Sequence, residues 1–593
     1  MGCFQSKASE TIAVAPDAKV SKTMLASNAS TSSRAVAMQG GGFRALATDV
    51  GLISGLLAFT NGEQQNAATL TSLLGNVDVL STGSGSTWFM TSLAYSVTFS
   101  AMLESMGQDF TKAESAFQNQ WVAGLKSIET KPDDQHILQM LRQFIEQNIK
   151  DEQQRAGLLE DIDLFSFLIT AGDISWQSFV SKMLKATAGI DETTELGDPV
   201  CTWATGKTLV INTSLLVPAP SADPLVGSCR VWEKDRKYVG YTVARDSKRK
   251  VHNVLPMAFR VRMTGSSDPH LTSDQPLVPG LRQGITFSYD TSEGVQKSRP
   301  APNGLISSGA NLGRLQVVNA AGASSAAVGP LDIIPKDGAS NLNTLMQSSV
   351  GFGPSDLVSW LATADPQGEL SFDSAAESIR RIQQDGQASS SNVQALCDFG
   401  VVGLGDSGVT EGTGVAGAIA AGANEVVAVL NCQNTTRSKW GIYDWTFLFQ
   451  LFKGGSPAYP DDKFIYPIFN ENVEQIKPDE MIEILADSTQ SYKELAGIKL
   501  GSLEVTTNDN GNFYFGIPLN TKVKLHVVNI SSKLTIGQAV DTSRFGVLAG
   551  DLAKAIGDQD GPNAKVVRET LLPMFRGSLP SLLDSIGRNR NGA

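Results

Sequence analysis

A serine between two glycines is the first residue in the chain whose surroundings suit nucleophilic chemistry. The segment Thr-Gly-Ser-Gly-Ser at 82–86 follows a short apolar run at 77–80 and precedes a helical pattern that starts near residue 87. A nucleophilic serine at a strand-to-helix turn has a strained backbone, so its neighbours must be small. Gly83 and Gly85 meet that need. A Ser/Gly-rich loop has the same composition, but the position after an apolar strand favours Ser84 as a nucleophile.

A run of three glycines at 40–42 lies between an apolar strand pattern at 34–38 and a helical pattern at 45–59. Glycines let backbone amides turn toward a bound oxygen, and a helix start adds positive potential. This arrangement suits an oxyanion hole, in which each donor contributes about 10²–10³ in rate. A dinucleotide loop of the form G-x-G-x-x-A also fits the letters. No acidic residue ends a second strand about 20 positions on, which weakens the nucleotide alternative.

A carboxylate with a plausible role as a base is Asp406, in the triplet Asp-Ser-Gly at 406–408. It follows the apolar residues 401–404 and opens a glycine-rich turn. A carboxylate at a strand end can accept the proton of a serine that the fold brings to it. In isolation, such a triplet is more often only a turn.

The elements around these residues predict an α/β fold. Two strand–turn–helix units in succession, at 34–59 and from residue 77 onward, indicate a parallel sheet. Residues 88–103 read as one buried helix, too polar and short to cross a bilayer. Residues 104–190 look helical, and short strands are expected over 200–350.

Further elements are expected toward the end of the chain, listed here by residue range. Strands are expected at 254–263, 425–430, 502–507, 512–517 and 522–529, with a turn at 508–511 and two closing helices.

The glycine loop and the elbow together carry a family resemblance. Gly-Gly-Gly-Phe-Arg-Ala at 40–45 with Gly-Ser-Gly-Ser-Thr-Trp-Phe-Met at 83–90 resembles the catalytic domain of cytosolic phospholipase A2, within the patatin-like superfamily. The resemblance implies a serine lipid acyl hydrolase of the phospholipase A or lysophospholipase type. Its fold would be a central, mostly parallel sheet flanked by helices. It covers about 70 residues near the N-terminus and about 30 around Asp406.

The resemblance also implies roles for individual residues. Ser84 would be the nucleophile and Asp406 the base of a catalytic dyad, with an acyl-enzyme intermediate. Gly41 and Gly42 would donate to the oxyanion, and Gly85 is expected to join them. Arg44 would help to hold the substrate phosphate headgroup or the active geometry. The expected division is a tether at 1–33 and a single domain at 34–593, with an insertion at about 104–390.

Two alternatives remain open. An α/β-hydrolase-type lipase with a Ser-Asp-His triad needs a histidine after the aspartate, and His526 is the one available. Its strand-like surroundings favour the dyad instead. From another class, the chain could be a catalytically inactive lipid-binding or scaffolding relative. The presence of Ser84, Asp406, Arg44 and the glycines together argues against inactivity.

The first six residues, Met-Gly-Cys-Phe-Gln-Ser, predict a lipidation signal that attaches the protein to a membrane. Gly2 fits the acceptor of N-myristoylation with Ser6 at the matching position, and Cys3 is a palmitoylation candidate. One myristoyl chain alone binds membranes marginally, so the second chain would make the anchor stable. We expect a tethered protein at the cytoplasmic face of a membrane, not a secreted one. In the family that the chain resembles, a calcium-binding C2 domain brings the enzyme to the membrane. We expect the acyl anchor to take that role here, so no calcium dependence is expected.

Composition limits the partners. The net charge of −12 argues against general nucleic-acid binding, and five cysteines and four histidines without a close cluster predict neither a metal site nor a disulfide framework. No cofactor is expected; the expected partners are a glycerolipid substrate and a membrane surface.

Two further segments could meet lipid. The aromatic residues 440–452 suit either a lipid interface or, as the preferred interpretation, a buried helix. The basic residues 230–250 could meet anionic lipid or form a solvated hairpin. Oligomeric state is not predicted.

Overall fold

The structure is a computed structural model that describes most of the expected catalytic core. The described residues are 33–63, 68–128, 143, 146–147, 176–216, 229–230, 240–241, 254–263, 316–326, 359–362, 401–433, 442–454, 467–485, 492–515, 517–534 and 542–577. The tether at 1–33, with Gly2 and Cys3, lies outside them apart from its last residue, as does nearly all of the basic segment 230–250.

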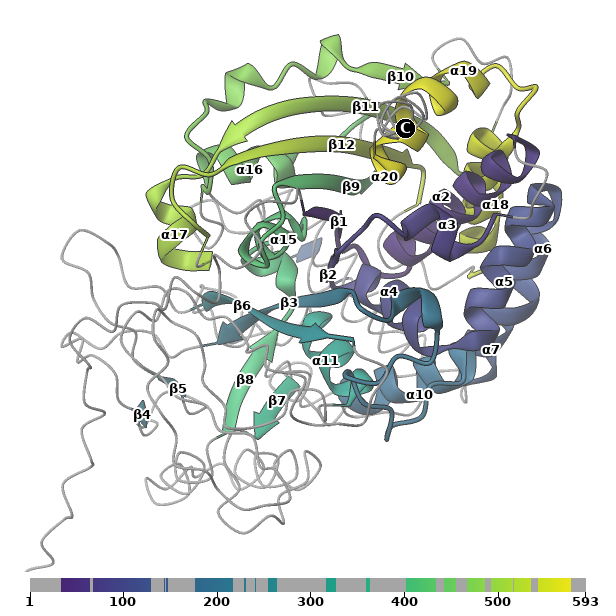
Figure 1. Cartoon of the computed structure of the whole chain (residues 1–593). Helices are drawn as coiled ribbons and strands as arrows, with labels where there is room; N and C mark the ends of the chain where they lie inside the picture. Colours follow the sequence, from purple (N-terminus) through teal and green to yellow (C-terminus); the bar gives the residue numbers. More distant parts are fainter. Residues whose placement is uncertain are drawn as a thin grey trace, which may run out of the picture.

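A single large sheet organises the described part of the chain (Figure 1). Its ten strands run in the order β10-β11-β12-β9-β1-β2-β3-β8-β7, and β6 also pairs with β3. The strands are β1 (Arg34–Met38), β2 (Val79–Gly83), β3 (Thr208–Leu216), β6 (Val254–Arg262), β7 (Ser359–Ala362), β8 (Val401–Gly405), β9 (Glu425–Gln433), β10 (Ile482–Ile484), β11 (Leu495–Thr506) and β12 (Lys522–Ser532).

The centre of the sheet is parallel and its margins are antiparallel. The neighbours β12, β9, β1, β2 and β3 all run in one direction. The strands β10 and β11 on one side, and β6, β8 and β7 on the other, pair antiparallel. The predicted α/β fold with a parallel central sheet is confirmed. Parallel strands need helical crossovers, which explains why the chain alternates strands and helices here.

Helices bury both faces of the sheet. Val36 and Met38 of β1 face one hydrophobic core while Ala35 and Ala37 face the other, as the two-residue period of a strand requires. In Figure 1 the helices of the first core gather around α2, α5 and α18, and those of the second around α15 and α16.

The helices of the first core are α2 (Gly42–Glu63), α3 (Leu70–Leu74), α4 (Gly85–Tyr95), α5 (Val97–Gln108), α6 (Ala113–Phe117), α7 (Ala123–Ser127), α10 (Trp176–Ala188), α11 (Val317–Ser324), α18 (Ser543–Gly557), α19 (Ala564–Val566) and α20 (Leu572–Arg576). Those of the second core are α15 (Val415–Ala420), α16 (Thr446–Lys453) and α17 (Asp509–Phe515).

Helix α2 is the central helix of the first core. By length and composition it is the one helix in the described part of the chain that could cross a membrane, yet its most apolar window is 100% buried inside the fold. A helix that is apolar all round is expected when protein surrounds it on every side. We therefore assign α2 to the core.

Three local predictions were wrong. The single helix expected at 88–103 is two helices, because Ser96 has an extended backbone and its side chain caps α5 by accepting from the amide of Phe99. The strand expected at 512–517 is largely the helix α17, since Asn508 Oδ1 accepts from the amide of Gly511 and starts a helical turn. Within the expected strands of 200–350, α11 is a short alanine-containing helix.

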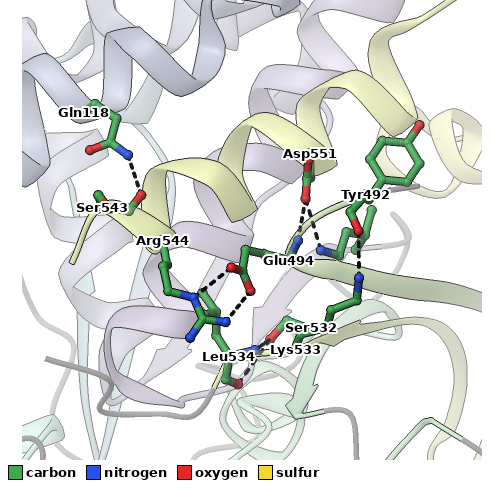
Figure 2. A network of polar contacts seen from close by, with 10 residues as sticks. Gln118, Tyr492, Glu494, Ser532, Lys533, Leu534, Ser543, Arg544 and Asp551 are labelled. Carbon is green, nitrogen blue, oxygen red and sulfur yellow. Dashed lines mark hydrogen bonds and ion pairs between the residues drawn. The ribbon is translucent and has the colours of Figure 1, made fainter. Parts of the chain in front are cut away.

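A polar network joins α18 to the residues just before β11 and just after β12 (Figure 2). The Glu494 carboxylate accepts from Arg544 Nε at 2.7 Å and Nη2 at 2.8 Å, in the fork geometry of a strong ion pair. Asp551 Oδ2 accepts from the amide of Glu494 at 2.7 Å, and Lys533 Nζ donates to the carbonyl of Tyr492 at 2.7 Å. The network fixes the carboxyl end of β12 against α18.

We expect Glu494→Ala to lower the free energy of unfolding by about 1–3 kcal/mol, because Glu494 is buried and its charge-assisted bonds are lost. Urea unfolding measures this. The matched control is Lys477→Ala, which breaks an ion pair with Glu480 whose side chains are 58% and 69% exposed. Such a surface pair contributes little, so the control should stay within about 1 kcal/mol of wild type. Equal losses of unfolding free energy in the two variants would contradict the expected stabilisation by the network.

Candidate active site

Ser84 lies at the sharp turn between β2 and α4, as the sequence predicts. Its backbone has φ 50° and ψ −127°, a region that residues with side chains rarely adopt. A Cβ on Gly40 would lie 2.6 Å from Ser84 Cβ, and a Cβ on Gly85 would overlap the backbone of Gly42. The glycines therefore let the elbow and the glycine loop approach each other closely.

The sheet brings Asp406 to Ser84 through one edge of β3. The strand β6 occupies the whole of the other edge, from Thr208 to Leu216. On the shared edge, β2 pairs in parallel as far as Gly83 opposite Asn212. The strand β8 arrives there from the opposite direction and ends with Gly405 opposite Ser214. The two strand ends meet across a single residue of β3, so the residues that follow them are neighbours.

Ser84 and Asp406 are in direct contact. Ser84 Oγ donates a hydrogen bond of 2.6 Å to Asp406 Oδ2, although 322 positions separate the residues in sequence. The other carboxylate oxygen, Oδ1, accepts from the amide of Gly408 at 2.6 Å, and the carbonyl of Asp406 accepts from Ser214 Oγ at 2.7 Å. Both residues are buried, with exposed fractions of 8% and 6%. The carboxylate is thus held in one orientation beside the serine.

Burial sets the basicity of this carboxylate. Loss of water around Asp406 raises its pKa to about 6, while the hydrogen bonds from Ser84 and Gly408 act in the opposite direction. The group is therefore charged at neutral pH, yet it is a better proton acceptor than an exposed aspartate.

The glycine loop follows β1 and is fixed from both sides. The amides of Gln39 and Gly40 donate to the carbonyls of Val429 and Gly412 at 2.9 and 3.0 Å. Asn431 Nδ2 donates to the carbonyls of Gln39 and Gly40 at 2.7 and 3.0 Å. These hydrogen bonds fix the backbone of Gln39 and Gly40. The amides of the next two residues, Gly41 and Gly42, take no part in them.

Gly41 and Gly42 have φ values of 144° and 57°, which favour glycine. A Cβ on Gly41 would lie 2.5 Å from Asn431 Oδ1. Helix α2 begins at Gly42, and the first amides of a helix have no partner within it. These amides therefore lie at a helix start next to Ser84, which is the placement that an oxyanion hole needs.

Arg44 supports the loop. Its Nε donates to Asn431 Oδ1 and its Nη2 to the carbonyl of Asn431, both at 3.3 Å. A longer contact of 3.5 Å joins its Nη1 to the carbonyl of Leu534. The residue is 4% exposed. Of the two roles expected for Arg44, these contacts favour holding the active geometry over binding a phosphate headgroup.

His526 is remote from the dyad. The strand register places His526 beside Val427 of β9, and through β1 in line with Leu80 of β2. Three strand spacings and the four residues from Leu80 to Ser84 separate them, which amounts to about 14 Å across the strands and about 13 Å along them. Its ring nitrogens contact Glu425 at 2.9 Å and Ser502 at 2.7 Å. Glu425 also pairs with Arg34 at 2.6 Å. The triad alternative with His526 is therefore contradicted, because the strand register holds the imidazole in a separate cluster.

The described part of the aromatic segment 440–452, which begins at residue 442, belongs mostly to the second core. Tyr443, Trp445, Leu448 and Leu451 are each at most 1% exposed, in and just before α16. The preferred interpretation of a buried helix holds for these residues. A Cβ on Gly412 would meet the ring of Phe447 at 2.8 Å, so this helix packs against the loop that holds Gly40.

Sequence reasoning missed several supporting residues. Asn431 and Ser324 have no motif around them. Glu411, whose pKa burial raises to about 7, sits one residue before the carbonyl that holds Gly40, and its Oε1 accepts from the amide of Thr413 at 2.9 Å. The sequence does contain a signal for the part of β3 where β2 and β8 meet. Asn-Thr-Ser at 212–214 follows three apolar residues on a buried strand. Three polar residues there predict side chains that bond to neighbouring backbone.

Comparison with known families agrees with this architecture. Residues 34–159 match the family described as the lysophospholipase catalytic domain. The matched stretch contains β1, the glycine loop, α2, β2 and the elbow with Ser84. Among curated proteins there is no match. Residues 34–159 are thus similar to the lysophospholipase catalytic domain family, in agreement with the expected cytosolic phospholipase A2, patatin-like type, and this similarity supports a lipid acyl hydrolase in general.

Proposed function

We propose that this protein cleaves acyl esters of glycerolipids at a membrane surface through a Ser84–Asp406 dyad and an acyl-enzyme intermediate. The observation that carries the proposal is the 2.6 Å hydrogen bond from Ser84 Oγ to Asp406 Oδ2 at the end of a strained strand-to-helix turn. The match of residues 34–159 supports a lipid acyl hydrolase in general, and we propose a reaction of the phospholipase A or lysophospholipase type.

In the first step, Ser84 Oγ attacks the carbonyl carbon of the ester while its proton passes to Asp406 Oδ2. The carbonyl oxygen becomes an oxyanion, which the amides of Gly41, Gly42 and Gly85 stabilise. Asp406 then returns the proton to the departing alkoxide. The products of this step are a lipid that lacks one acyl chain and an acyl ester on Ser84.

In the second step, water takes the place of the alcohol. Asp406 accepts a proton from the water as its oxygen attacks the acyl carbonyl, and the same amides hold the second oxyanion. The proton then passes to Ser84 Oγ as the acyl bond breaks. A fatty acid leaves, and the dyad returns to its starting state. One carboxylate thus serves as base and acid in turn.

The dyad is tested by Ser84→Ala and Asp406→Asn. Each variant should lose at least about 10³-fold in kcat, because the nucleophile or its base is gone. Hydrolysis of phospholipid and lysophospholipid vesicles, followed by lipid analysis of the products, measures the loss. A fluorophosphonate probe should label the wild type at Ser84 and leave Ser84→Ala unlabelled.

His526→Ala is the matched control. It removes a buried side chain but should keep most of the activity at temperatures where the variant is folded. Loss of activity comparable to that of Asp406→Asn would restore the triad. An unlabelled Ser84 in folded wild type, with lipid still bound, would instead favour a lipid-binding relative without catalysis.

The pH dependence follows from the raised pKa of Asp406. The base must be unprotonated to accept the serine proton, and its pKa is about 6. We therefore expect kcat/KM to be constant at alkaline pH and to fall about tenfold per unit below pH 6. A pH–rate profile on a soluble ester checks this.

Glu411 is a second buried carboxyl near the loop, with a pKa of about 7. The variant Glu411→Gln keeps an oxygen that can accept from Thr413. If the acid limb stays near pH 6 in that variant, it belongs to Asp406. A limb that moves or disappears would assign it to Glu411 and contradict the proposed base.

We also propose that acylation of Gly2 and Cys3 holds the enzyme at the cytoplasmic face of a membrane. The support is the N-terminal sequence alone. Gly2→Ala should shift the protein from the membrane fraction to the soluble fraction, and Cys3→Ser should weaken retention because one chain anchors only marginally. Ser84→Ala is the matched control and should stay with the membrane. An unchanged distribution of Gly2→Ala would overturn the anchor without affecting the dyad.

A further inference from the structure

We propose that Ser324, the last residue of α11, is a positioning residue that holds the nucleophile in its strained conformation. Ser324 Oγ accepts the backbone amide of Ser84 at 2.9 Å. Helix α11 itself packs beside β3 and α10 (Figure 1). This inference rests on the proposed function, since it assigns a support to the serine of the dyad.

The direction of each hydrogen bond around Ser324 is fixed. A serine hydroxyl has one proton and two lone pairs. Its proton goes to the carbonyl of Asn212 at 2.6 Å, because a carbonyl can only accept. The lone pairs then take the Ser84 amide and the Thr87 hydroxyl, the latter at 3.0 Å. Every bonding position of Ser324 Oγ is therefore used.

The bonds close into a ring around the elbow. Thr87 gives its proton to Ser324, so it accepts from Thr82 Oγ1 at 3.1 Å. Asn212 Nδ2 donates to the carbonyl of Thr82 at 2.9 Å, which returns the ring to β3. The ring ties the residue before Gly83 and the first turn of α4 to α11 and β3. The elbow is thus bonded on both sides of Ser84.

The Ser84 amide has a consequence for the oxyanion hole. Because this N–H points to Ser324, it is already used and does not serve the substrate. The oxyanion must be held by the amides of the glycine loop and of Gly85. Releasing the Ser84 amide would let the backbone at φ 50° relax and turn Oγ away from both the carbonyl carbon and Asp406.

Ser325 offers a matched comparison. Its Oγ accepts from the indole nitrogens of Trp88 at 3.0 Å and Trp176 at 3.2 Å, and it donates to the carbonyl of Ala321 at 2.7 Å. Ser324 and Ser325 are adjacent, equally small and both at most 1% exposed. Their substitution by alanine removes a similar number of buried hydrogen bonds, but only Ser324 contacts the nucleophile.

The experiment compares Ser324→Ala with Ser325→Ala in the full chain. We expect Ser324→Ala to lower kcat about 10- to 100-fold with KM within threefold, because a small displacement of a reacting atom has effects of that size. The rate of fluorophosphonate labelling at Ser84 should fall by the same factor. Ser325→Ala should keep kcat within threefold while its thermal midpoint falls at least as far. Ser324→Thr, which restores a hydroxyl, should recover part of the lost kcat.

Three results would overturn the inference: a kcat within threefold of wild type in Ser324→Ala, equal losses in both alanine variants, or a loss confined to KM. If Ser324→Ala does not fold, Ser324→Cys replaces it, with an expected loss of at least about fivefold from the weaker sulfur acceptor. Failure of the proposed function has a different signature: wild-type protein that neither hydrolyses esters nor reacts with the probe. The two failures are therefore separable.

Discussion

The meeting of two strand ends on one edge of β3 is the constraint on which the site depends. With β6 covering the other edge, β2 and β8 share the remaining one and approach from opposite directions. Thr213 and Ser214 fasten the arriving end of β8 by donating from their hydroxyls to the carbonyls of Gly405 and Asp406, both at 2.7 Å. The contact between Ser84 and Asp406 therefore follows from the strand pairing. The register brings the two residues together, and the surrounding loops orient their side chains.

The same site combines local strain with dense support. Ser84 has an unfavourable backbone, Asp406 is a charged group in a buried place, and both cost stability. Around them the glycine loop is held through Asn431 and Arg44, and the elbow through the ring that includes Ser324. This polar shell holds the Asp406 carboxylate beside Ser84, and its Oδ2 accepts the proton of the Ser84 hydroxyl.

The sequence alone predicted the parts of the site that carry strict local requirements. Glycines next to a nucleophile and at a loop with positive φ have few substitutes, so their spacing pointed to Ser84, Gly41 and Gly42. The α/β fold followed from alternating strand and helix patterns. Ser324 and Asn431 could not be found, since one hydroxyl or amide at a distant position has no pattern of its own. The helix α17 was missed because a side-chain cap at Asn508 outweighed strand-like residues. For Arg44 the sequence left two roles open, and the contacts that favour one of them lie on β9 and just beyond β12, far away in the chain.

The order of the strands along the chain adds a consequence for biosynthesis. The strands β1, β2 and β3 come from the first 216 residues, whereas β8 and Asp406 arrive much later. When only the N-terminal part has left the ribosome, Ser84 is present without Asp406, and β9, the neighbour of β1, is also still missing. The contact between Ser84 and Asp406 can therefore form only after β8 has paired with β3, late in synthesis. A product of premature termination before Asp406 lacks this contact altogether.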